Sequence, residues 1–154
     1  MIKTFEYYLI KLFLKKIFSI SLIFFLLVFI LSIFDEISYF KDLSTNFYFP
    51  FFLTLLNSPS TLFEIFPFIF LIATQFFFIE LINKDELEIF KVHGTNNFKI
   101  IKIIFMTSFL LGILLIAVFY NFSAKFKFLY LDLKNSYSND NKYLAVVNEN
   151  GLWI

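Results

Sequence analysis

The sequence contains no cysteine and no arginine, and it has only three glycines, three prolines and one histidine. Without cysteine the chain can form no disulfide, thiolate nucleophile or cysteine-based metal site, which leaves its redox compartment open. The glycines are scattered, so no glycine-rich loop of the kind that holds a nucleotide phosphate is present. The 13 basic residues balance 12 acidic ones, and no basic run is longer than two residues. This charge pattern argues against nucleic-acid binding.

Apolar side chains dominate what is present. Of the 154 residues, 60% are hydrophobic and only 16% are charged, 27 are phenylalanine, and the mean hydropathy is +0.81. Soluble domains are about 45–50% apolar and about 25% charged, and one of this size cannot bury so much apolar surface in a single core. Disorder is excluded as well, because it requires low hydrophobicity and high net charge. The sequence therefore predicts a mainly α integral membrane protein.

Three stretches are long and apolar enough to cross a bilayer as helices. A hydrocarbon core about 30 Å thick needs about 20 residues at about 1.5 Å each. We predict spanning helices at residues 17–34, 62–82 and 103–122. The first and third contain no charged residue, whereas the second has Glu64 and Pro67 near its start and Glu80 near its end.

An apolar run at residues 47–56 lies between the first two predicted spans and is too short to cross. We interpret it as an interfacial or partly re-entrant segment of a loop, residues 35–61, since unpaired backbone is tolerated at membrane depth only where protein or water covers it. The alternative is one long kinked helix from about residue 47 to 82. We prefer two pieces, because the serine before Pro59 can cap a new helix.

Lysine positions predict the orientation, because lysines in short flanks are retained on the cytoplasmic side. Four lysines precede the first span and four lie in the loop 83–102, whereas the loop 35–61 contains only Lys41. We therefore expect the N-terminus and the loop 83–102 to be cytoplasmic. After three crossings the tail, residues 123–154, then lies outside.

The two ends of the chain have patterns of their own. Residues 1–16 place apolar side chains at helical spacing, which indicates either an interfacial amphipathic helix or an early start of the first spanning helix with its lysines reaching to the interface. In the tail, a helical pattern over residues 126–133 and a polar stretch precede two apolar runs, 143–147 and 152–154, typical of a β-hairpin. Because an isolated hairpin is marginal in water, we expect it to begin a larger β-domain that the chain enters but does not complete.

No catalytic constellation is present. His93 is the only histidine and has no cysteine or second histidine with which to share a metal, so we interpret it as a loop or helix-end residue. Asp85, Glu86 and Glu88 are explained by a solvated helix start. We predict no catalytic residue, no metal site and no cofactor.

The loop between the second and third spans predicts a short amphipathic helix lying crosswise at the cytoplasmic face. Leu87, Phe90 and Lys91 fall at positions i, i+3 and i+4. Asp85 can cap the start of this helix, and Gly94 can end it in the left-handed conformation. Such a helix can dock into a groove of a soluble partner. A connector without a partner explains the pattern equally well.

Several short motifs have a familiar order and spacing. Asn57-Ser58-Pro59 is followed by Glu64-Ile65-Phe66-Pro67, and after an apolar span by Lys84-Asp85-Glu86-Leu87 and Gly94. This arrangement resembles the LptF/LptG family of lipopolysaccharide export permeases, in which a proline in the second spanning helix precedes a Glu-Leu pair, with a glycine eight residues after the Glu. Tyr8, Asp35 and Gly151-Leu152-Trp153 also look like this family. The Ser-Pro and Phe-Pro spacing favours LptG.

The resemblance implies the N-terminal half of a six-helix permease of the bacterial inner membrane, with a periplasmic β-jellyroll between the third and fourth helices. It also implies that LptF and LptG pair around a cavity for lipopolysaccharide, that an LptB-type ATPase dimer docks on cytoplasmic coupling helices, and that LptC and LptA carry the lipid onward. Carried over by position, the coupling helix contains Glu86, Leu87, Phe90 and Gly94.

The resemblance also gives expectations for the substrate. Phe25 and Phe29 of the first span suit acyl chains, although membrane lipid is the default neighbour of such residues. Family members place basic residues at the outer end of the first helix, where these can meet lipid A phosphates. This chain departs from that pattern, because it has Asp35 and Glu36 there and only Lys41 beyond them.

Two other classes of function remain open at the level of sequence. A small three-helix membrane scaffold or assembly protein without transport activity fits the three spans. A lipid-modifying enzyme would need acidic or histidine side chains facing one another at membrane depth. Glu64 and Glu80 lie at opposite ends of the second span and do not meet this requirement.

Overall fold

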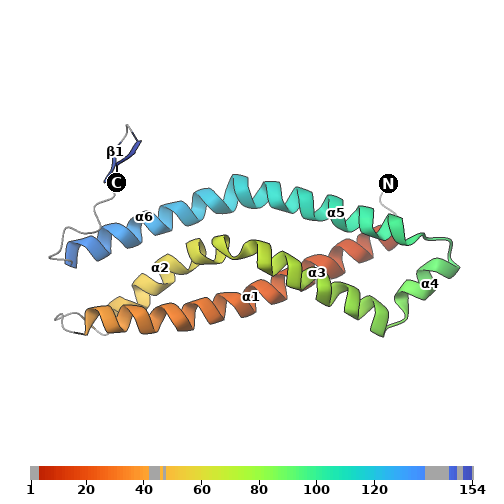
Figure 1. Cartoon of the computed structure of the whole chain (residues 1–154), viewed down its shortest axis with the longest axis horizontal. Helices are drawn as coiled ribbons and strands as arrows, with labels where there is room; N and C mark the ends of the chain where they lie inside the picture. The colour runs from red at the N-terminus through yellow and green to blue at the C-terminus, as the bar shows by residue number, and fades with distance from the viewer. Residues whose placement is uncertain (1–3, 42–45, 47, 138–145, 149–150, 154) are drawn as a thin grey trace.

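A computed structural model describes residues 4–41, 46, 48–137, 146–148 and 151–153 of the chain. In chain order, the helices are α1 (Thr4–Phe40), α2 (Tyr48–Glu64), α3 (Phe66–Asn83), α4 (Glu86–Val92), α5 (Asn97–Leu114), the π-helical turn η1 (Leu115–Phe119) and α6 (Tyr120–Tyr137). α2 packs against both α1 and α6, whereas toward α4 it is α1 that contacts both α3 and α5 (Figure 1). We call the two ends of this elongated bundle the α4 end and the α6 end, the latter containing the last turns of α1 and α6 and the start of α2.

Within the described residues, three helices are long and apolar enough to cross a membrane, namely Thr4–Phe40, Phe66–Asn83 and the continuous helix Asn97–Tyr137. In their most apolar windows only 17%, 28% and 6% of the residues are buried, respectively. Apolar surface left open to this degree requires lipid or other protein as its surroundings. The prediction of three membrane-crossing helices is confirmed by length and composition.

Two of these helices are longer than the sequence analysis expected. Residues 4–34 belong to one helix, which corresponds to the early-start alternative for residues 1–16, and α1 measures about 55 Å at 1.5 Å per residue. The third span does not end at residue 122 either, because η1 leads directly into α6, which continues to Tyr137. Both helices exceed a hydrocarbon core of about 30 Å. Helix α6 thus contains the helical pattern predicted over residues 126–133.

The break between the second and third helices lies at Ile65, not at Pro59. Within α2 the hydroxyl of Ser58 donates to the carbonyl oxygen of Thr54 at 2.6 Å, so the serine is bonded inside the helix instead of capping a new one. Pro67 stands in the first turn of α3, where its missing N–H removes no helical hydrogen bond. Residues 48–83 thus form two helices that meet at Ile65, and residues 48–56 belong to the first of them. An interfacial or re-entrant position for this segment stays a prediction.

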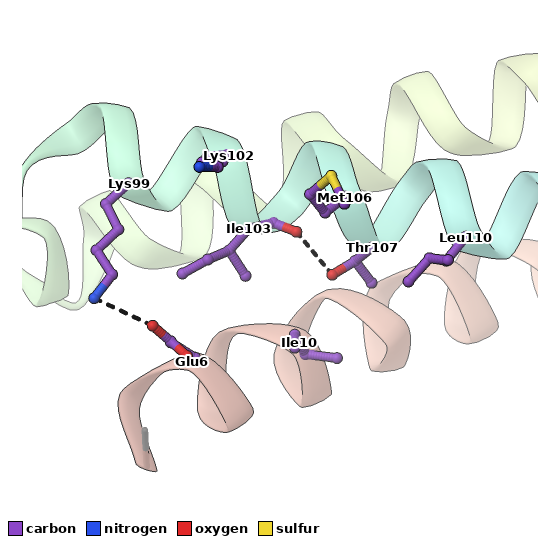
Figure 2. Close-up of a pocket in the computed structure, with 8 residues that line it drawn as sticks. All are labelled: Glu6, Ile10, Lys99, Lys102, Ile103, Met106, Thr107 and Leu110. Carbon is purple, nitrogen blue, oxygen red and sulfur yellow. Dashed lines mark hydrogen bonds and ion pairs between the residues drawn. The ribbon is translucent and has the colours of Figure 1, made fainter. Parts of the chain in front are cut away.

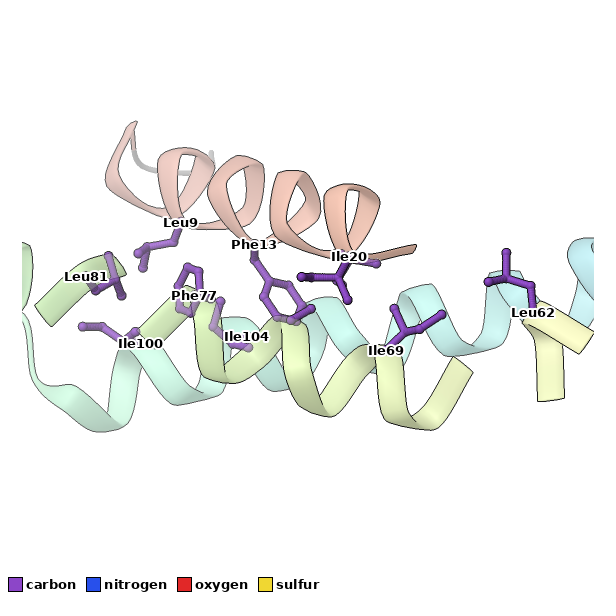
Figure 3. Close-up of a cluster of buried hydrophobic side chains, with 11 residues drawn as sticks. Leu9, Phe13, Ile20, Leu62, Ile69, Phe77, Leu81, Ile100 and Ile104 are labelled. Carbon is purple, nitrogen blue, oxygen red and sulfur yellow. The ribbon is translucent and has the colours of Figure 1, made fainter. Parts of the chain in front are cut away.

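The main hydrophobic cluster joins α1, α3 and α5 toward the α4 end. Figure 3 shows Phe13 of α1 and Phe77 of α3 between the two helices, where their rings meet edge to face at 5.5 Å. The fully buried members include Leu9, Phe13, Ile69, Phe77 and Leu81. A smaller cluster at the α6 end contains Phe40, Leu53, Leu56 and Tyr130.

Two short strands follow the helices, β1 (Val146–Asn148) and β2 (Gly151–Trp153). They pair antiparallel, with Val146 opposite Trp153 and Asn148 opposite Gly151. These strands fall within or beside the two apolar runs expected to form a hairpin, whose remaining residues lie outside the described part of the chain. A jellyroll that begins here stays a prediction.

Candidate functional site

The helix α4 connects two membrane-crossing helices and has no fully buried residue of its own. It begins after Asp85, whose backbone is left-handed with φ of 55°, and it ends before Gly94, whose φ is +77°. At the end of α4, the Thr95 N–H donates to the Phe90 carbonyl and the Gly94 N–H to the Lys91 carbonyl, both at 2.9 Å. This is a Schellman motif, and it confirms Gly94 as the left-handed stop. The expected side-chain cap from Asp85 is wrong, because its carboxylate makes no capping hydrogen bond.

Two contacts fasten α4 to the first turns of α1. The Tyr8 hydroxyl donates to Glu86 Oε1 at 2.7 Å, and the rings of Phe5 and Phe90 meet edge to face with centroids 4.6 Å apart. Leu87 packs, with Phe90, against the main hydrophobic cluster. Three of the four residues assigned to a coupling helix, Glu86, Leu87 and Phe90, thus face their own chain.

The opposite face of α4 is open. Val92 is 84% exposed, and Ile89, which lines a pocket with Phe5 of α1, is 50% exposed. Glu86 faces inward, and its second oxygen, Oε2, is buried without a hydrogen-bond partner among the described residues.

Lysines near the α4 end are paired with acidic side chains of neighbouring helices. Glu80 of α3 forms ion pairs with Lys16 of α1 and with Lys84. The hydrogen bond from Lys84 to the Glu80 carboxylate raises the pKa of this lysine above its ordinary value. Figure 2 shows a third pair, in which Lys99 of α5 lies 3.2 Å from Glu6 of α1. These pairs link α1 to α3 and to α5 at the end that carries α4.

A buried polar cluster joins α1 to α6 at the opposite end. Glu36 is only 3% exposed, and it accepts hydrogen bonds from the Tyr130 hydroxyl at 2.7 Å and from Lys134 at 2.9 and 3.0 Å. The ammonium group of Lys134 also lies 4.5 Å from the ring centre of Tyr39. This cluster was not predicted from the sequence; its only local signal is the i, i+4 spacing of Tyr130 and Lys134.

The residues predicted for substrate contact are not brought together. The rings of Phe25 and Phe29 stack on each other at 6.4 Å along α1. Lys41 follows the last residue of α1 and is exposed, about 18 Å along the helix axis from Phe29. In the part of the chain that the structure describes, no group of three or more His, Cys, Asp and Glu side chains is arranged to hold a metal ion.

These features define the class of the protein: a multi-pass membrane protein with three crossing helices among its described residues and a short helix between the second and third. The family model described as lipopolysaccharide export system permease LptF/LptG matches residues 7–154. The chain therefore belongs to the LptF/LptG family of lipopolysaccharide export permeases of the inner membrane. No curated protein and no solved structure matches it.

Proposed function

We propose that this chain is the membrane subunit that couples ATP hydrolysis by a partner ATPase to the extraction of lipopolysaccharide from the inner membrane. The observation that carries the proposal is α4, an exposed crosswise helix fastened to α1 by the Tyr8–Glu86 hydrogen bond and the Phe5–Phe90 contact. The partner at α4 is an LptB-type ATPase dimer. It is the kind of soluble partner that an exposed apolar anchor on a short helix recognises.

The coupling follows from how α4 is attached. A partner that moves α4 pulls on α1 through Glu86 and Phe90, and the ion pairs of Glu80 and Glu6 transmit the displacement to α3 and α5. Long helices move as rigid bodies, so a shift at the α4 end changes the separation of the helices at membrane depth. ATP binding shifts the helix arrangement only if the ATP-bound ATPase binds one arrangement more tightly than the other.

The contact surface on α4 is its outward face. Ile89 and Val92 meet the ATPase, whereas Glu86, Leu87 and Phe90 hold α4 on the bundle. Glu86 is then a positioning residue, and Gly94 sets where the helix ends. The four residues carried over from the family thus have two roles: Glu86, Leu87 and Phe90 hold α4 on the bundle, and Gly94 ends the helix.

The proposed surroundings follow the family and the distribution of lysines. The α4 end lies in the cytoplasm and the α6 end in the periplasm, because lysines flank the first turns of α1 and the region around α4. The chain is LptG-like and corresponds to the N-terminal half of a permease. It pairs with a second LptF/LptG subunit and delivers lipopolysaccharide to LptC and LptA.

Acyl chains of the substrate lie against the exposed apolar face of α1 near Phe25 and Phe29. The cationic groups that meet lipid phosphates come from Lys41 and from Lys127 of α6. Lys127 Nζ is hydrogen-bonded to the neutral amide oxygen of Asn57 at 2.6 Å, so its charge is not compensated by that partner. Lys134 is less suited to this role, because Glu36 neutralises it.

Copurification of a tagged chain with its ATPase tests the proposal. Val92→Asp places a carboxylate in the apolar contact, and we expect it to reduce ATPase recovery about tenfold, as loss of a central interface residue does. Glu86→Ala is expected to cause a smaller loss, because α4 is then held less firmly. Ser136→Asp adds the same carboxylate at an exposed position of the α6 end and is the matched control.

Membrane insertion of all three variants is measured in the same cells and is expected to be unchanged. Full ATPase recovery with both Val92→Asp and Glu86→Ala would contradict the assignment of α4 as the coupling helix. Loss of recovery with Ser136→Asp as well would show a general effect of added charge.

A further inference from the structure

A groove lies between the first turns of α1 and the start of α5, and the proposed coupling uses only the Glu6–Lys99 ion pair at its mouth. Its volume is about 540 Å³, within the range of about 300–1,000 Å³ typical of small-ligand sites. Figure 2 shows Glu6 and Ile10 of α1 on one side and residues of α5 on the other. The groove therefore lies along the helices, and begins at the α4 end.

The polarity of this groove changes along its length. Lys99 and Lys102 line it at the α4 end, whereas Met106 and Leu110 line it farther along α5 (Figure 2). These four positions follow one another at helical spacing, so they share one face of α5. The hydroxyl of Thr107 donates to the carbonyl of Ile103 at 2.8 Å, so its proton is already used within α5.

The charge at the mouth of the groove is positive. Glu6 pairs with Lys99 at 3.2 Å, while Lys102 has no ion-pair partner among the residues that the structure describes. Two lysines against one glutamate leave one net positive charge. Both lysines lie in the first two turns of α5, where the amide ends of the helix dipole also favour an anion.

Along the groove, few side chains of α5 are covered by the other helices. Among the described residues of α5, only Ile100 and Ile104 are buried, and Met106 and Leu110 are 48% and 62% exposed. An apolar trough at membrane depth that opens beside lysines matches a molecule with a long hydrocarbon chain and an anionic head. Basic pockets between membrane helices bind anionic lipid head groups in this way.

We infer that this groove binds one anionic glycerophospholipid of the leaflet at the α4 end. Its phosphate group contacts Lys102 and Lys99, and one acyl chain lies along Ile10, Met106 and Leu110. The lipid fills the gap between α1 and α5, next to the helix pair through which α4 is attached. The inference does not depend on the ATPase or on the lipopolysaccharide cargo.

Native mass spectrometry of the full chain tests it. The protein is delipidated in detergent and titrated with phosphatidylglycerol or with phosphatidylcholine of identical acyl chains. We expect phosphatidylglycerol to be retained at lower concentration, and Lys102→Gln to weaken its retention about fivefold, the effect of one lysine near an anionic lipid. Lys11→Gln removes an exposed lysine of α1 outside the groove and is expected to change retention less than about twofold.

A second pair of variants tests the acyl-chain site. Met106→Trp fills the groove and is expected to reduce retention of both lipids, whereas Phe105→Trp alters a neighbouring exposed position of α5 outside the groove and leaves retention unchanged. Equal retention of the two lipids, or equal losses with Lys102→Gln and Lys11→Gln, would overturn the inference. It would also be overturned if Met106→Trp had no effect, since the lipid would then lie elsewhere.

Discussion

At the scale of single residues, two left-handed positions set the limits of α4. Asp85 and Gly94 stand immediately before and shortly after it, with φ of 55° and +77°. Aspartate tolerates this conformation better than most side chains, and glycine has no steric penalty there. The sequence predicted the role of Gly94 correctly, because glycine after an amphipathic turn is a common stop signal. It did not predict the backbone of Asp85, since the same residue type serves as an ordinary cap.

We expect Gly94→Ala to loosen the end of α4. The structure leaves space for a Cβ atom at this position, so the cost comes from the backbone conformation and amounts to about 1 kcal/mol. Hydrogen exchange of the Thr95 amide, which bonds to Phe90, should become about fivefold faster. Gly94→Asn should have a smaller effect, because asparagine adopts the left-handed conformation more readily.

Gly112→Ala is the matched control for this measurement. Gly112 lies inside α5 and also has no atom within 4 Å of a built Cβ, but its backbone is helical. Alanine there should leave the Thr95 amide unchanged. Identical exchange in Gly94→Ala and the wild type would show that the left-handed turn does not limit the stability of α4.

At the scale of elements, Pro59 and Pro67 have different effects on the helices that contain them. A proline ends a helix only when the freed carbonyl and the ring cannot be accommodated. Pro59 remains inside α2, where nearby serine and threonine side chains bond to backbone carbonyls. Pro67 stands at the start of α3, where its geometry favours a new helix. Pro59 therefore lies within one helix, whereas Pro67 lies at the start of the next.

The cluster of Glu36, Tyr130 and Lys134 holds α1 and α6 together at the α6 end. We expect Glu36→Leu to destabilise the protein by about 3 kcal/mol, because it leaves Lys134 without a counter-charge in a largely buried site. Thermal unfolding of the purified chain in detergent measures the effect. Asp35→Leu changes the adjacent, exposed carboxylate and should cost less than about 0.5 kcal/mol.

The double variant Glu36→Leu with Lys134→Leu separates charge from packing. It removes both charges, so it should be more stable than Glu36→Leu alone. If the single and double variants unfold at the same temperature, the ion pair is not the source of the effect. If Asp35→Leu lowers the unfolding temperature as much as Glu36→Leu does, the burial of Glu36 is not the cause of the destabilisation.

At the scale of the whole molecule, the exposed apolar surface and the charges define how the bundle lies in the membrane. The helix Asn97–Tyr137 has only 6% of its most apolar window buried, so lipid or further protein must cover it. Lysines surround the α4 end, and their retention in the cytoplasm predicts the orientation. The absence of cysteine makes this orientation directly testable, because every introduced thiol is unique.

We expect Asn83→Cys at the α4 end to react with a membrane-impermeant maleimide only after the inner membrane is opened. Ser136→Cys at the α6 end should react once the outer membrane alone is permeable. Both side chains are exposed in the structure, so accessibility depends on the compartment. The opposite pattern would reverse the orientation and would place α4 away from any cytoplasmic ATPase.

Sequence alone determined that the chain crosses a membrane, where the three crossings lie to within a few turns, and that a short amphipathic helix separates the last two. These properties depend on local composition and spacing, which a single segment carries by itself. Only the tertiary structure decided that Glu86 faces Tyr8, that Glu36 is buried against Lys134, and that α1 and α5 leave a groove between them. Each of these depends on the rotation and crossing of helices distant in sequence, and an almost uniformly apolar helix surface does not encode which face meets which neighbour.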